Sequence, residues 1–308
     1  MDDQNKQTQR GVILALLAYT MWGIAPIYFK SLQHVGALEI LSHRVIWSFF
    51  FLTGLLILSR GWGQVRAVLA QPKRVLMLTA TALLIGANWL IFIWAINNNY
   101  MLNASLGYYI NPLINVVLGM LFLGERLRPL QWVAVAIAGG GVAVQLIQFG
   151  SLPWIALALA CSFGLYGLLR KKINLDAATG LFMETCVLLP LAAIYVLLFA
   201  SSPTSDWTAN PLSTNILLMA AGIVTTLPLL CFTGAATKLK LSTLGFFQYI
   251  GPSLMFILAI VLYDETFTVD KGYTFAFIWA ALLLFSIDGL RHRRHNTKIT
   301  QTQLSQSK

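Results

Sequence analysis

The chain has 308 residues, of which 57% are hydrophobic and only 10% are charged, and its mean hydropathy is +0.72. A soluble domain carries about 25% charged residues, so this composition excludes a large soluble helical domain. The net charge of +10 does not indicate nucleic-acid binding, because the Lys and Arg residues lie in short gaps between apolar runs, where membrane topology places them.

Ten apolar runs follow one another along the chain. Most of them hold about 18–23 residues, enough for a helix to cross a hydrocarbon core of ~30 Å. The runs cover residues 11–29, 38–58, 75–96, 104–123, 130–149, 152–169, 178–200, 214–236, 243–263 and 273–290. The sequence therefore predicts an all-α integral membrane protein with ten transmembrane helices.

The basic residues gather on one side of these predicted spans. If the N-terminus lies inside, 18 of the 21 Lys and Arg residues fall in inner segments, and only Lys30 and Lys271 fall outside. Cytoplasmic segments carry an excess of Lys and Arg in membrane proteins. We therefore expect both termini to be cytoplasmic, residues 291–308 to form a basic cytoplasmic tail, and the protein to lie in the cell inner (plasma) membrane.

Two stretches of the chain, 103–126 and 241–267, resemble each other. When Pro112 is set over Pro252, at an offset of 140, Tyr109 also meets Tyr249. Each proline lies midway along an apolar run, where it removes a backbone donor and kinks or breaks a helix. Two interrupted helices at matching places in two halves are typical of transporters built by duplication. We expect both helices to break near the bilayer midplane.

The repeat divides the chain into halves of five spans, 1–150 and 151–290. Because five is odd, the second half enters the membrane from the opposite side. The predicted fold is therefore two inverted five-helix repeats followed by the basic tail.

Several short motifs resemble those of a known family. Each half carries a proline-containing fourth helix that ends in a turn, Leu-Gly-Glu-Arg at 123–126 and Tyr-Asp-Glu-Thr at 263–266. With the opening Ala-Tyr-Thr-Met-Trp-Gly at 18–23, the chain resembles the EamA-type members of the drug/metabolite transporter superfamily, and within them the RarD branch. The second half departs from the pattern at its turn. The resemblance implies an inner-membrane transporter with ten helices and a central cavity, and it leaves the substrate open.

The second predicted span contains three ionisable residues, Glu39, His43 and Arg44. Glu39 and His43 are four residues apart and share a helix face, and Arg44 lies roughly 9 Å below the outer end at 1.5 Å per residue. In one interpretation Arg44 pairs with Glu39 near the membrane surface. In the other, Arg44 faces the cavity with His43 and receives a substrate anion.

Glu184 lies within the seventh span, about six residues from its inner end. An acid inside a membrane span indicates a function by default. Its expected role is to carry a coupling proton or to bind a substrate amine, and the alternative is a structural hydrogen bond to a neighbouring helix.

Polar and aromatic residues recur in other spans, where a buried amide needs a partner in protein or in a wet cavity. We expect them to line a substrate site shared by the two halves, although helix-to-helix hydrogen bonds are the alternative. These residues are Trp22, Asn88, Tyr108, Asn111, Asn115, Gln248 and Tyr249.

The favoured function is a secondary transporter, an exporter of small organic metabolites such as amino acids or related zwitterions, coupled to protons. The alternatives are a permease for amphiphilic drugs or toxic compounds, a passive channel, and an integral-membrane enzyme. A primary pump is excluded because the chain has no P-loop. The four scattered His residues do not form a metal or catalytic constellation, so we expect no metal, no cofactor and no enzyme activity. The expected partners are the lipid bilayer and a small-molecule substrate, with no nucleic acid, and a homodimer stays open.

Overall fold

The computed structural model describes residues 2–97, 100–149, 153–200, 203–263, 272–273, 276–289 and 291, and within these ranges every regular element is a helix. The basic tail beyond 291 and the turn at 264–267 lie outside the described residues. The helices are α1 (Asp2–Lys30), α2 (Ala37–Leu58), α3 (Trp62–Leu69), α4 (Pro72–Asn97), α5 (Met101–Leu123), α6 (Pro129–Phe149), α7 (Trp154–Ile173), α8 (Ala177–Ile194), the π-helix η1 (Tyr195–Phe199), α9 (Leu212–Ala236), α10 (Leu241–Gln248), α11 (Ile250–Tyr263) and a last helix over Ala276–Gly289.

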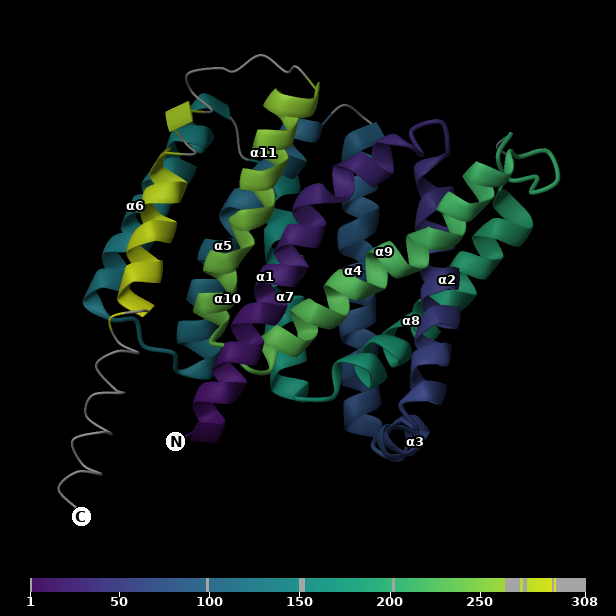
Figure 1. The fold of residues 1–308 in the computed structure, drawn as a ribbon, viewed down its shortest axis with the longest axis horizontal. Coiled ribbons are helices and arrows are strands. Elements are labelled where there is room, and N and C mark those ends of the chain that lie inside the picture. The colour runs from purple at the N-terminus through teal and green to yellow at the C-terminus, as the bar shows by residue number, and fades with distance from the viewer. Residues whose placement is uncertain are drawn as a thin grey trace.

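A helix covers each of the ten predicted apolar runs within the described residues. Seven of these helices are long and apolar enough to cross a membrane, and the segments Pro129–Val144 and Ala276–Gly289 are shorter apolar helices. The short helix α3 was not predicted, and it connects α2 to α4 on the side of the bundle where α1 begins (Figure 1).

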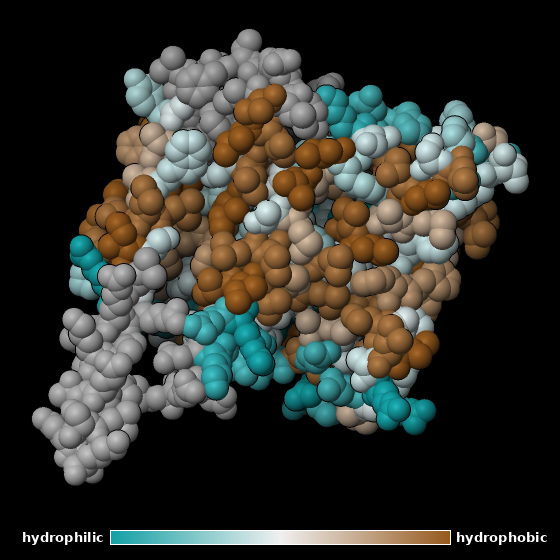
Figure 2. Space-filling view, viewed as in Figure 1, coloured by the Kyte–Doolittle hydropathy of each residue, from teal (hydrophilic) through white to brown (hydrophobic). Residues whose placement is uncertain are grey.

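The surface carries many large apolar side chains. Leu58 and Ile147 are 84% and 80% exposed, and hydrophobic residues cover the middle of the face drawn in Figure 2, whereas hydrophilic residues gather toward its lower rim and upper edge. Contiguous apolar surface of this extent marks contact with a membrane or a partner. Together with the apolar helices, this surface identifies a multi-pass membrane protein.

Helices from the two halves of the sequence interleave. Helix α5 packs on α7, α4 packs on α7 and α8, and α1 and α2 both pack on α9. Figure 1 shows α9 crossing the bundle obliquely, in front of α4 and α8, with α6 and the 276–289 helix as a pair at one end. The two halves therefore form one bundle rather than two separate bodies.

Glycines allow three pairs of helices, α2 with α9, α5 with α7, and α5 with α10, to approach closely. A Cβ at Gly222 of α9 would lie 2.4 Å from the backbone of Trp47 on α2, and one at Gly107 of α5 would lie 3.1 Å from a carbonyl oxygen of α7. A Cβ at Gly245 of α10 would lie 2.9 Å from the carbonyl oxygen of Pro112 on α5. Small residues at helix contacts are the usual means of association in membranes.

The prediction that both prolines break their helices is wrong for the first half. Helix α5 continues through Pro112, whereas the second copy is interrupted at Tyr249, three residues before Pro252. A single missing donor is tolerated within a helix that has neighbours. In the second copy the turn before Pro252 tightens to a bond from the Tyr249 N–H to a carbonyl three residues earlier.

Candidate functional site: a small cavity between five helices

A small cavity lies at the centre of the bundle, between α2, α4, α7, α8 and α9. The space open to water centres is ≈ 20 Å³, which is room for about one or two water molecules. Its polar lining consists of Ser48, Tyr166, Glu184, Thr185, Thr225 and Thr226, and aliphatic residues with Trp89 form the rest. A larger ligand requires these helices to separate.

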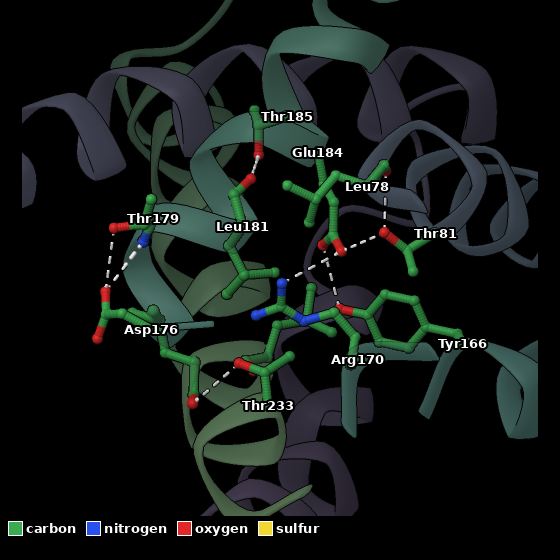
Figure 3. Close-up of polar contacts among 12 residues, drawn as sticks. Leu78, Thr81, Tyr166, Arg170, Asp176, Thr179, Leu181, Glu184, Thr185 and Thr233 are labelled. Carbon is green, nitrogen blue, oxygen red and sulfur yellow. Dashed lines mark hydrogen bonds and ion pairs between the residues drawn. The ribbon is translucent and has the colours of Figure 1, made fainter. Parts of the chain in front are cut away.

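The Glu184 carboxylate is the ionisable group on the cavity wall. Glu184 is 2% exposed, and its two oxygens accept hydrogen bonds from Thr81 Oγ1 at 2.6 Å and from the Tyr166 hydroxyl at 3.2 Å. The Arg170 Nη1 atom lies 3.6 Å from Glu184 Oε1. Figure 3 shows these three side chains pointing toward one carboxylate from α4 and α7. The arrangement neutralises a buried acid, as burial of a charge requires.

The Thr81 hydroxyl gives Glu184 a second mode of bonding. Thr81 Oγ1 lies 2.9 Å from the Leu78 carbonyl oxygen and 2.6 Å from Glu184 Oε1, and a hydroxyl has one proton to donate. When Glu184 is ionised, Thr81 donates to it. When Glu184 is protonated, it can donate to Thr81, which then donates to Leu78. This geometry gives the Glu184 carboxyl and the Thr81 hydroxyl hydrogen-bond partners in either protonation state.

Arg44 lies near the cavity on its α2 side. Its Nε donates to Thr225 Oγ1 at 2.7 Å, and Thr225 lines the cavity. The guanidinium carbon lies 4.9 Å from the centre of the Trp89 ring and 5.5 Å from that of Phe29, distances at which a cation is attracted to the ring face. Glu39 of the same helix accepts a hydrogen bond from Thr204, in the loop before α9.

The other residues expected at the site divide into two groups. Tyr108 is 37% exposed, and its ring contacts that of Phe92. Its hydroxyl interacts electrostatically with Arg44. His43 and Trp22 lie away from the cavity lining. The His43 ring packs on Trp207, in the loop before α9, with 5.3 Å between the ring centres. The Trp22 ring packs in an aromatic cluster between α1, α7 and α9.

The amides expected to line a shared cavity are used for helix contacts. Asn88 donates to the Leu159 carbonyl oxygen and to Ser162 Oγ on α7, each at 2.9 Å. Asn111 donates to the Ala160 carbonyl oxygen at 2.6 Å.

The remaining members of the expected set lie near the two prolines. Asn115 donates to Asn111 at 3.0 Å, the Tyr249 hydroxyl donates to the Tyr109 carbonyl oxygen at 3.2 Å, and Gln248 is buried on α10. The glycines in α5, α7 and α10 bring these helices close together. None of these residues lies in the lining of the cavity described above, so their place at a shared substrate site stays a prediction.

Polar residues at the helix ends near the start of α10 join the two halves. The Glu125 carboxylate accepts from the backbone N–H groups of Leu241 at 2.5 Å and Ser242 at 3.0 Å, and from the Ser242 hydroxyl at 2.7 Å. It thereby caps the N-terminus of α10, where a negative charge is favourable. Lys171 donates to the carbonyl oxygens of Ala236 and Leu239 at the end of α9. These bonds tie α10 and the end of α9 to α7 and to the segment after α5.

Sequence reasoning missed Arg170 and the two hydroxyls around Glu184. Arg170 was counted with the cytoplasmic basic residues, yet it is 2% exposed and pairs with Glu184. One signal was present, because Tyr166 precedes Arg170 by four residues and Gly180 precedes Glu184 by four, so each pair shares a helix face. No group of three His, Cys, Asp or Glu side chains within the described ranges could hold a metal ion.

Comparisons with known proteins agree with these features. The profile of the EamA-like transporter family matches residues 9–147, within the first predicted repeat. An uncharacterized transporter of Vibrio cholerae is 64% identical, covering 94% of this chain and 96% of its own length. Protein RarD of Escherichia coli K12 is 59% identical, covering 95% and 99%.

A more distant relative and a solved structure extend this likeness. The chloramphenicol-sensitive protein RarD of Pseudomonas aeruginosa is 31% identical over 94% of this chain and 97% of its own. One crystal structure superimposes with a TM-score of 0.68 over 89% of this chain and 96% of that one, at 19% identity, which shows a shared fold. Membrane helices, fold and relatives together show that this chain is a membrane transporter of the EamA-like family in the drug/metabolite transporter superfamily and belongs to its RarD-like members.

Proposed function

We propose that this transporter is a secondary exporter of small organic metabolites, amino acids or related zwitterions, coupled to protons in the inner membrane. The observation that carries the proposal is the cavity between α2, α4, α7, α8 and α9. The Glu184 carboxylate lies on its wall, and so does Thr225, whose hydroxyl accepts a hydrogen bond from Arg44. Secondary transporters place the substrate site near the bilayer midplane, between repeated halves.

The pattern of helix contacts supports the proposed inverted repeat of ten spans. In that repeat α1, α2, α4 and α5 correspond to α7, α8, α9 and the pair α10–α11. Exchanging each helix for its counterpart converts the contact α1–α9 into α7–α4, α2–α9 into α8–α4, and α5–α7 into α11–α1, and all of these contacts occur. A pseudo-twofold axis would produce this pattern.

We propose that both termini are cytoplasmic. The inner positions of the basic residues motivate this orientation. A reporter domain that is active only in the cytoplasm, fused after Lys308, is expected to be active, and the same reporter inserted at Thr208, in the loop before α9, is expected to be silent. If the Lys308 fusion is silent while a reporter that functions only in the periplasm is active there, the orientation is inverted.

The two ends of a zwitterion match the two charged groups of the site. A guanidinium binds a carboxylate through two parallel hydrogen bonds, and the Arg44 guanidinium is held by Thr225 and two aromatic rings. The Glu184 carboxylate on the cavity wall suits an ammonium group. The cavity accepts such a ligand only after its helices separate, as alternating access requires.

Replacement of Arg44 tests this assignment. A thermal-shift screen of the purified protein against a metabolite library first identifies a ligand, because a ligand of the native state raises stability. Arg44→Ala is expected to weaken binding of a zwitterionic ligand by about 2–5 kcal/mol and binding of its amide much less. Arg44→Lys serves as the matched variant, because Lys keeps the positive charge but lacks the planar guanidinium that forms two parallel hydrogen bonds. Equal losses for the acid and the amide in Arg44→Ala would assign Arg44 a structural role.

A permease for amphiphilic drugs is the second candidate function. The cavity wall is largely aliphatic and includes Val45, Leu52, Ile85 and Trp89, and one relative is named for chloramphenicol sensitivity. The same screen separates the candidates, since an amphiphile without a carboxylate would bind equally well to Arg44→Ala.

A further inference from the structure

The Arg170 guanidinium is buried without a hydrogen-bond acceptor. Arg170 lies in the last turn of α7 and is 2% exposed. Within the described part of the chain, its Nε, Nη1 and Nη2 atoms have no hydrogen-bond partner. The 3.6 Å between Nη1 and Glu184 Oε1 exceeds the 2.7–2.9 Å typical of a charge-assisted hydrogen bond. Glu184 thus compensates the charge of Arg170 and leaves its donors unused.

Glu184 does not depend on Arg170 for its own hydrogen bonds. Its two oxygens already accept from Thr81 and Tyr166. A buried donor without an acceptor is costly, and a guanidinium presents five N–H donors in a planar fork. The unsatisfied member of this pair is therefore the cation, and the chemistry that would satisfy it is a second anion with two acceptor oxygens.

The packing around Arg170 is shaped to hold a guanidinium. A Cβ at Gly180 of α8 would lie 1.8 Å from Arg170 Nη1, so the absence of a side chain there makes room for the cation. Arg170 follows Tyr166 by one helical turn toward the inner end of α7. Tyr166 and Glu184 both line the cavity, and in Figure 3 the guanidinium lies below the Glu184 carboxylate and beside the Tyr166 hydroxyl, whereas Thr185 lies above the carboxylate. An anion that leaves the cavity toward the inner side would meet Arg170 next.

We propose that Arg170 is a second carboxylate-binding site on the transport path, on the inner side of Glu184. A small organic carboxylate occupies the guanidinium fork when the Glu184 side chain withdraws from it. The fork geometry of Arg favours a carboxylate over a spherical anion. The inference rests on the proposed function, because it adds a second binding site for the same class of substrate to the transport path on which Arg44 lies.

Phenylacetate and its neutral isostere phenylacetamide probe this site in the full chain, reconstituted in lipid nanodiscs. Glu184→Gln removes the competing carboxylate, and its amide oxygen can accept from Tyr166 while its NH2 group donates to Thr81, which in turn donates to the Leu78 carbonyl oxygen. In this variant phenylacetate is expected to raise the thermal midpoint with an apparent affinity about tenfold tighter than in the unsubstituted protein, and phenylacetamide is expected to have no effect. Adding Arg170→Gln to this variant is expected to remove the gain, and adding Arg170→Lys is expected to reduce it.

The outcomes separate this inference from the proposed function. Arg170 is not a carboxylate site if Glu184→Gln does not bind phenylacetate more tightly than the unsubstituted protein does. The same conclusion holds if the tighter binding persists when Arg170→Gln is added to Glu184→Gln. Should the Arg170→Gln double variant fail to fold, the Lys double variant decides, and an undiminished affinity overturns the inference. Arg44→Gln added to Glu184→Gln is expected to keep the gain. Loss of the gain with Arg44→Gln and not with Arg170→Lys would place the anion at Arg44 alone, which leaves the proposed function intact.

Discussion

Gly222→Ala is expected to force α9 away from α2 and to cause a larger loss of stability than the addition of a methyl group to an open position of α2. The new Cβ would lie 2.4 Å from the backbone carbon of Trp47 and 2.6 Å from the backbone nitrogen of Ser48. Backbone atoms cannot rotate aside as side chains can, so the helices must separate. Overpacking of this kind costs about 1–3 kcal/mol and sometimes more.

The separation would also lengthen the hydrogen bonds that join α2 to α9. Ser48 Oγ donates to the Gly222 carbonyl oxygen at 3.1 Å, and Thr226 Oγ1 donates to Ser48 Oγ at 2.8 Å. Ser48 and Thr226 line the cavity, so ligand binding is expected to fall together with the thermal midpoint. The measurement is the thermal midpoint in detergent or nanodiscs, with and without a ligand from the screen.

Gly54→Ala is the matched control, because Gly54 lies in the same α2 helix with nothing within 4 Å of its would-be Cβ. Ala favours a helix over Gly by up to about 1 kcal/mol, so the midpoint of this variant should stay constant or rise. If Gly222→Ala and Gly54→Ala have the same midpoint, close approach of the two backbones does not stabilise the bundle.

Glu184→Gln is expected to abolish the pH dependence of transport while the protein remains folded. Glu184 can be satisfied both ionised and protonated, because Thr81 can donate to it or accept from it and pass its own proton to Leu78. Gln keeps the shape and the acceptor oxygen but cannot gain or lose a proton near neutral pH. The measurement is uptake of the identified substrate into proteoliposomes, over a series of pH values.

Glu39→Gln provides the control for this experiment. Glu39 is a second buried acid, but it accepts a hydrogen bond from Thr204 in the loop before α9 and lies outside the cavity lining. Its variant is expected to keep the pH profile of the unsubstituted protein. An unchanged profile in Glu184→Gln would instead make Glu184 a structural partner of Arg170, without a proton-coupling role.

Local sequence predicted the helices well because a membrane span is a local property. Burying about 20 apolar residues in a helix satisfies the backbone internally and does not depend on which helices lie beside it. Pro112 shows the limit of this reasoning, since α5 continues through Pro112 whereas the second copy is interrupted at Tyr249, three residues before Pro252. The resemblance to EamA-type proteins likewise rested on short motifs that the chain carries on its own.

The site depended on contacts between distant segments, and these the sequence could not supply. Asn111 and Arg44 are both polar residues in apolar runs, yet close packing of α5 on α7 uses Asn111 as a helix contact, while Arg44 reaches Thr225 beside the cavity. Arg170 looked like one more cytoplasmic basic residue until the fold placed it beside Glu184 and Gly180. Hydropathy determined which segments enter the membrane, because transfer from water depends on each segment alone. Only the tertiary structure decided which polar groups face the cavity, because that depends on how closely pairs of helices can approach.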